Sequence, residues 1–95
     1  MFTLTSPDQI TAADGYVVKV LGRTGLEYRE GERVVLIDSE VLVTGRGMAI
    51  FKKSLERWQP PHDAEVISAE KKKEILSRLV AAVKFAWSQA PIEIL

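Results

Sequence analysis

A predicted amphipathic helix between Ser68 and Pro91 constrains the fold most. Ser68 is placed to cap the first turn of this helix, Glu70 suits the positive end of the helix dipole, and Pro91 ends the helix. Such a helix needs an apolar surface to pack against. The apolar residues that recur at helical spacing are Ile75, Leu76, Leu79, Val80, Val83, Ala86 and Trp87.

The residues before this helix have the pattern of strands. Val34 to Ile37 are apolar at every position, which is typical of a central strand covered on both faces, and Asp38-Ser39-Glu40 predicts a bend or bulge before Val41. We expect an α+β fold, an antiparallel meander of four to five strands with one C-terminal amphipathic helix on one face. The predicted strands, separated by turns and rich in β-branched, aromatic or alternating residues, are 16–21, 26–29, 33–37 continuing to 41–43, 48–51 and a short 92–94.

Length and composition limit the remaining classes. The 95 residues fit one domain, 1–95, in which the polar segment 1–14 is expected to be a loosely ordered lead-in. The chain has no cysteine, which excludes disulfides, thiolate nucleophiles and cysteine zinc sites. Thirteen basic and thirteen acidic residues cancel, so no net field attracts nucleic acid or an anionic membrane. With no secretory signal and no apolar run long enough to span a membrane, we expect a cytoplasmic protein.

Charge is unevenly distributed along the chain. Residues 27–40 hold five acids against two arginines, a local charge of −3, and residues 41–60 hold four bases against one acid, a local charge of +3. Patches of opposite sign side by side suit a protein partner better than nucleic acid, although solvated surface is the simpler interpretation. On the predicted hairpin, the acids available to a partner are Glu27, Glu30 and Glu32.

Few residues could carry catalysis. His62 is the only histidine, and an exposed loop histidine is a simpler interpretation than a general base or a metal ligand. Ser68 and Lys71 have the S-x-x-K spacing of some acyl-transfer enzymes, but a helix cap explains the serine. We therefore predict no catalytic, cofactor or metal site. A pocket that combined Asp38, Glu40 and His62 would indicate a small enzyme instead.

Phe85 falls away from the apolar stripe on a helical wheel, near Glu74 and Arg78. A position covered by a neighbouring loop and a contact with another chain both fit this pattern. The second leaves open a general interaction or regulatory module, which could dimerise through Phe85 or through an edge strand.

Four motifs follow one another in a set order: Y-R-E-G at 28–31, the run from Val34 to Glu40, F-K-K-S at 51–54 and R-W-Q-P-P-H at 57–62. In this order they resemble the immunity protein 74 family of bacterial polymorphic toxin systems, over roughly residues 16–83. The resemblance implies a non-enzymatic protein that binds and neutralises a cognate toxin. Arginine and tryptophan are frequent at binding hot spots, so Arg57 and Trp58 join the three glutamates as partner-binding candidates. A structural role for Trp58, which would lock the crossing segment against the helix, is the simpler alternative.

Overall fold

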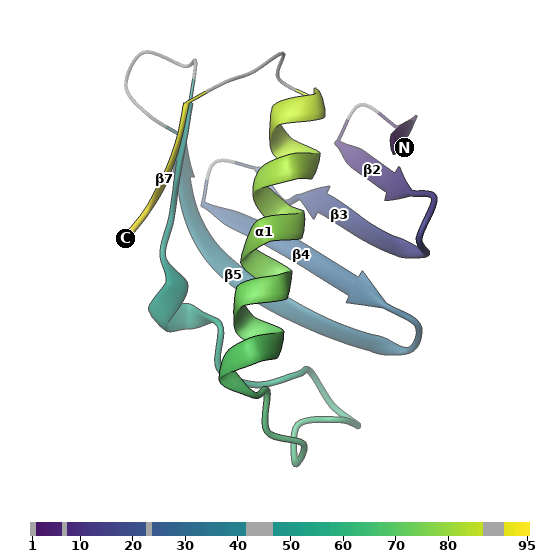
Figure 1. Ribbon diagram of the computed structural model, residues 1–95, viewed down its shortest axis with the longest axis vertical. Coiled ribbons are helices and arrows are strands. Elements are labelled where there is room, and N and C mark those ends of the chain that lie inside the picture. Colours follow the sequence, from purple (N-terminus) through teal and green to yellow (C-terminus); the bar gives the residue numbers. More distant parts are fainter. Residues whose placement is uncertain (1, 7, 23, 42–46, 87–90) are drawn as a thin grey trace.

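The structure is a computed structural model that describes residues 2–6, 8–22, 24–41, 47–86 and 91–95. Seven strands form one sheet in which the spatial order follows the chain order. Neighbouring strands are antiparallel except β6 and β7, which are parallel. The helix α1 (Ala69–Ala86) crosses one face of this sheet (Figure 1), which confirms the α+β class and the C-terminal helix. The strands are β1 (Phe2–Ser6), β2 (Gln9–Ala12), β3 (Tyr16–Val20), β4 (Gly25–Glu30), β5 (Arg33–Val41), β6 (Met48–Ile50) and β7 (Ile92–Ile94), with a short 3-10 helix, η1 (Lys52–Ser54), after β6.

The expected strand number of four to five is wrong, because residues 1–14 contribute β1 and β2 rather than a loosely ordered lead-in. In β2 the alternation of polar and apolar residues turns Ile10 and Ala12 toward the core, where both are buried. β1 then pairs with β2 at the edge of the sheet. Two strands of four and five residues with many threonines have too little hydrophobic periodicity to be detected from the sequence.

β5 also differs from the expectation. It runs without interruption through Asp38-Ser39-Glu40, and its burial alternates, with Val35, Ile37 and Ser39 turned inward. Leu36, between them, is 44% exposed, so the strand is covered on one face and not on both. The reason is that α1 covers only one side of the sheet. The expected continuation at 42–43 and the turn at 44–46 lie outside the described residues.

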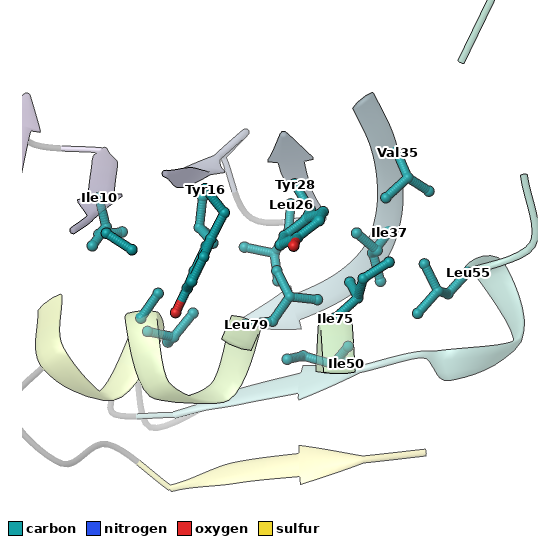
Figure 2. Close-up of a cluster of buried hydrophobic side chains, with 14 of the residues drawn as sticks. Ile10, Tyr16, Leu26, Tyr28, Val35, Ile37, Ile50, Leu55, Ile75 and Leu79 are labelled. Carbon is teal, nitrogen blue, oxygen red and sulfur yellow. The ribbon is translucent and has the colours of Figure 1, made fainter. Parts of the chain in front are cut away.

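The core lies between the sheet and α1. Figure 2 shows side chains from β2, β3, β4 and β5 directed toward the helix. The predicted helical stripe is confirmed, since Ile75, Leu79 and Val83 are buried and its other members pack against the core, except Trp87, which lies outside the described residues. The Ser68 cap is confirmed as well: its Oγ accepts a hydrogen bond from the backbone N–H of Lys71 at 3.1 Å.

η1 and the segment between η1 and α1 close the edge of β5 that β6 leaves open. β6 pairs only with residues 39–41 of β5. Ahead of that, the Ser54 hydroxyl accepts a hydrogen bond from the Asp38 N–H at 2.8 Å, and the Gln59 N–H donates to the Val34 carbonyl at 2.6 Å. These bonds hold the segment with its cis Pro60–Pro61 peptide bond beside the start of β5.

Candidate functional site

The turn between β4 and β5, the loop 57–66 and the first turn of α1 lie together at one end of the molecule, which we call the hairpin end (Figure 1). Two ion pairs join these parts, and a backbone bridge closes the loop on itself. Arg33 of β5 binds Glu65 of the loop, Lys71 of α1 binds Glu30 of β4, and Arg57 forms an antiparallel bridge with Val66. The hairpin end is therefore one surface built from three distant parts of the sequence.

The Arg33–Glu65 pair fixes the loop to the hairpin. Arg33 Nε and Nη2 donate to Glu65 Oε1 at 3.0 and 2.8 Å, and Nη2 also reaches Oε2 at 3.1 Å. His62 Nδ1 lies 2.9 Å from the same Oε2. The hydrogen bonds from Arg33 and then from His62 lower the pKa of the Glu65 carboxyl group. A bidentate pair of this kind fixes the orientation of both side chains, because the guanidinium and the carboxylate must keep one relative geometry.

Val66 is the most exposed large apolar residue of the hairpin end, at 89%. Its backbone is held by the bridge to Arg57, whose side chain is also exposed. Val66 thus presents an apolar side chain on a fixed backbone among charged neighbours, and one of these, Arg57, is of a residue type enriched at binding hot spots. Beside it lies an open hollow of about 340 Å³, lined by Glu56, Arg57, Asp63, Ala64, Glu65, Val66 and Lys72.

Trp58 follows Arg57 but points the other way. Its side chain is buried in the hydrophobic core, at 4% exposure. The tryptophan therefore anchors the loop from beneath, and its neighbour Arg57 remains on the surface. A partner that lies on the hairpin end reaches Arg57 directly and Trp58 only through the loop it supports.

Glu30 is enclosed in a polar network on the helix side of the sheet. Its Oε1 accepts hydrogen bonds from the Tyr28 hydroxyl at 2.6 Å and from Arg78 Nη1 at 3.1 Å, and lies 2.7 Å from Lys71 Nζ. Burial alone raises the pKa of this carboxyl group, but the hydrogen bonds from Lys71 and Tyr28 and the positive charges nearby outweigh it, so the pKa is lowered. Lys71 and Arg78 also bind Glu74 at 2.8 and 3.2 Å.

The other two glutamates lie elsewhere. Glu27 is on the outer face of the sheet, opposite α1, with Arg29 Nη2 3.6 Å from its Oε1. Glu32 is exposed in the β4–β5 turn. Because adjacent strand residues point to opposite faces, Glu27 and Glu30 cannot present one acidic surface. The structure thus brings Glu32 and Arg57 to the hairpin end, supports it with Glu30 and Trp58, and sets Glu27 apart.

The residues considered for catalysis are not brought together in the described part of the chain. Asp38 lines a shallow hollow with Phe51, Lys53, Ser54 and Leu95, whereas His62 pairs with Glu65 in the loop. Glu40 is exposed on the outer face of β5. Among the described residues, no group of three or more histidine, cysteine or acidic side chains is close enough to hold a metal ion.

Val66, Arg33 and Glu65 do not appear among the residues selected from the sequence. Valine is usually buried, so its type argues against exposure. Here the next residue, Ile67, points into the core, and neighbouring residues of an extended segment point to opposite sides. The Arg33–Glu65 pair joins residues 32 positions apart. A family motif offers the one available signal, because R-W-x-P-P at 57–61 already marks this loop.

Comparison with known proteins gives one match. The family model described as Immunity protein 74 matches residues 15–92. No curated protein and no solved structure matches the chain. In the described residues, α1 is the only long helix, and no helix is both long and apolar enough to cross a membrane.

Proposed function

This chain belongs to the immunity protein 74 family, and we propose that it binds a cognate bacterial toxin domain and neutralises it without catalysing a reaction. The observation that carries the proposal is the extent of the family match, which includes β3 to β6, the loop 57–66, all of α1 and the first residue of β7. We expect this binding to take place in the cytoplasm, where the toxin would otherwise act on the producing cell.

The hairpin end is the proposed contact surface. Val66 supplies an exposed apolar anchor, and Arg57 and Glu32 supply exposed charges of opposite sign. Glu30 and Trp58 contribute indirectly, because the first holds the hairpin to α1 and the second holds the loop to the core. Interfaces typically combine such an anchor with a polar rim.

The charge of this surface favours a partner that also carries both signs. Glu30 is neutralised by Lys71 and Arg78, and Glu65 is paired with Arg33, so neither adds a free negative charge. The rim of the hollow still holds Glu56 and Asp63 against Arg57 and Lys72. Neutralisation would then follow from covering the toxin's active groove with complementary charges and one apolar contact, rather than from presenting a single acidic strip.

Glu27 defines an alternative contact surface. It lies on the outer sheet face with Lys19 and Leu36 as cross-strand neighbours. Leu36 is half exposed there, so this face too could meet a partner. We favour the hairpin end, because its apolar anchor is more exposed and lies beside a hollow that a partner side chain can enter.

The direct test is growth of cells that express the toxin domain encoded beside this gene, with and without this chain. The proposal predicts that the toxin alone stops growth, that co-expression restores it, and that the two proteins purify as a complex. Co-expression of an unrelated protein of similar size is the control. A toxin whose effect persists at equal expression of this chain would contradict the proposal and leave a general interaction module.

A further inference from the structure

β1 forms one edge of the sheet. The strand is short and its register with β2 shifts between Leu4 and Ser6, but it carries no charge. Among the described strands, none pairs with its outer side. The strand reads Phe2-Thr3-Leu4-Thr5-Ser6, without a charged residue or a proline. Natural edge strands commonly carry a lysine, another charge or a proline, because these discourage pairing with a further strand. The edge strand at the other side of the sheet, β7, has Glu93 at its centre.

Apolar side chains flank this open edge on the helix side. Leu4 is 48% exposed and Phe85 of α1 is 45% exposed. The side chain of Phe2, the first residue of β1, extends toward α1, and its ring centroid lies 5.4 Å from that of Phe85. Phe2, Leu4 and Phe85 form what we call the β1 patch. The sequence left open whether Phe85 is covered by a neighbouring segment or faces another chain. In the structure its ring packs against Phe2 on one side and remains half exposed.

We propose that this chain forms a homodimer in which β1 pairs antiparallel with β1 of a second copy. In that arrangement the two sheets become continuous, and a two-fold axis perpendicular to the sheet places both α1 helices on the same side. Each β1 patch then meets the patch of the other copy. The proposal uses residues outside the hairpin end, so it stands or falls independently of toxin binding.

A second copy is the occupant that the chemistry of β1 favours. Across a two-fold axis every charge near the axis meets a like charge, which destabilises cross-strand pairs. β1 has no charge to repel its own copy, whereas two β7 strands would bring their glutamates close together. A specific foreign strand would normally be selected by charged side chains along the edge, and β1 offers only threonine, serine, leucine and phenylalanine.

The interface is small. A strand of five residues spans about 17 Å, and with three apolar side chains per copy it falls below the standard size of about 1,600 Å² for stable complexes. The dimer should therefore be a weak one, with a dissociation constant in the range of about 10 to 100 µM. Because no ion pair contributes, the constant should change by less than about threefold between low and high salt.

Sedimentation velocity of the full chain over a concentration series of about 5 to 500 µM tests this directly. The expected result is a weight-average mass that rises from 10.6 kDa toward twice that value. Leu4→Lys places a charge at the edge and should raise the dissociation constant at least about tenfold. Ile94→Lys, on the β7 edge, is the matched control and should leave the constant unchanged.

Phe85→Lys provides a second variant on α1 in case Leu4→Lys disturbs β1, and the far-ultraviolet circular dichroism of each variant shows that it is folded. A mass that stays at 10.6 kDa at the highest concentration would overturn the proposal. So would a dimer that Ile94→Lys abolishes and Leu4→Lys leaves intact. A monomer whose toxin binding is lost in Leu4→Lys would also overturn it, because the occupant of β1 would then be the toxin.

Discussion

Arg78 Nη1 donates a hydrogen bond to the Tyr28 hydroxyl oxygen at 2.7 Å and thereby joins the middle of α1 to the buried face of β4. Tyr28 in turn donates to Glu30 at 2.6 Å, so one arginine orients both partners. The guanidinium carbon of Arg78 also lies 4.6 Å from the ring centroid of Tyr16. This contact fixes how α1 sits on the sheet, and through Glu30 and Lys71 it fixes the hairpin relative to the start of the helix.

Replacing Arg78 with methionine should destabilise the fold by about 1 to 3 kcal/mol, because the buried Tyr28 hydroxyl and the Glu30 carboxylate lose a charged donor. Methionine keeps much of the side-chain packing over Tyr16. The measurement is urea unfolding followed by circular dichroism. Arg29→Met is the matched control on the outer face and should cost less than about 0.5 kcal/mol. Equal losses in the two variants would show that the network adds nothing.

Stability should fall in acid partly through Glu30. Its pKa in the folded protein is below the ordinary value of 4.5, so its ionised form stabilises the fold above that pH. This contribution is lost as the pH falls from about 4.5 through the lower folded pKa. The difference in unfolding free energy between the wild type and Glu30→Gln should thus be largest near neutral pH and shrink below pH 4.5. A difference independent of pH would contradict the assigned role.

Both tyrosines of the chain should resist ionisation. Burial raises the pKa of Tyr16 and, more strongly, that of Tyr28, where the hydrogen bond to Glu30 adds to the effect. Because the folded pKa values exceed the ordinary 10.0, the stability they contribute is fully present below pH 10 and declines above it. Absorbance near 295 nm, followed while the pH rises, should show a midpoint above 10 in the folded protein. The urea-unfolded chain should titrate near 10, and a folded midpoint at that same value would exclude the buried arrangement.

Trp58 should matter for stability more than for contact. Trp58→Ala should destabilise the fold by about 3 to 5 kcal/mol, since it removes a buried ring beneath the loop. Trp58→Phe keeps an apolar ring and should retain toxin binding within about threefold, as expected for a residue that supports an interface from below. The measurements are urea unfolding and the dissociation constant of the toxin complex. Loss of affinity in a fully stable Trp58→Phe protein would instead place the indole in the interface.

Sequence patterns predicted the elements whose signals are local. The stripe of α1 and the cap at Ser68 follow from helical spacing and from one side chain at the first turn. β1 and β2 were missed because short threonine-rich segments become strands only when a neighbouring strand supplies their partners. The single-sided burial of β5 depends on where α1 lies, and no run of apolar residues reveals that.

For the candidate site too, local patterns predicted some of the residues but not the contacts that those residues make with distant parts of the chain. The motif at 57–61 marked the loop, and charge marked the hairpin, but the partners of each residue come from far along the chain. Glu30 is neutralised by Arg78, 48 residues away, so its type alone suggested a free acid. The residue type of Val66 predicts burial, whereas in the structure its neighbour Ile67 takes the core position and Val66 faces solvent.

The most direct test of the central claim, that the hairpin end binds the toxin, compares two aspartate variants of exposed apolar residues. Val66→Asp changes the hairpin end, and Leu36→Asp changes the outer sheet face near Glu27. Titration calorimetry with the purified toxin domain, on variants shown to be folded, should give a dissociation constant at least about 100-fold weaker for Val66→Asp and unchanged within about threefold for Leu36→Asp. The reverse pattern would move the contact to the outer face and contradict the account.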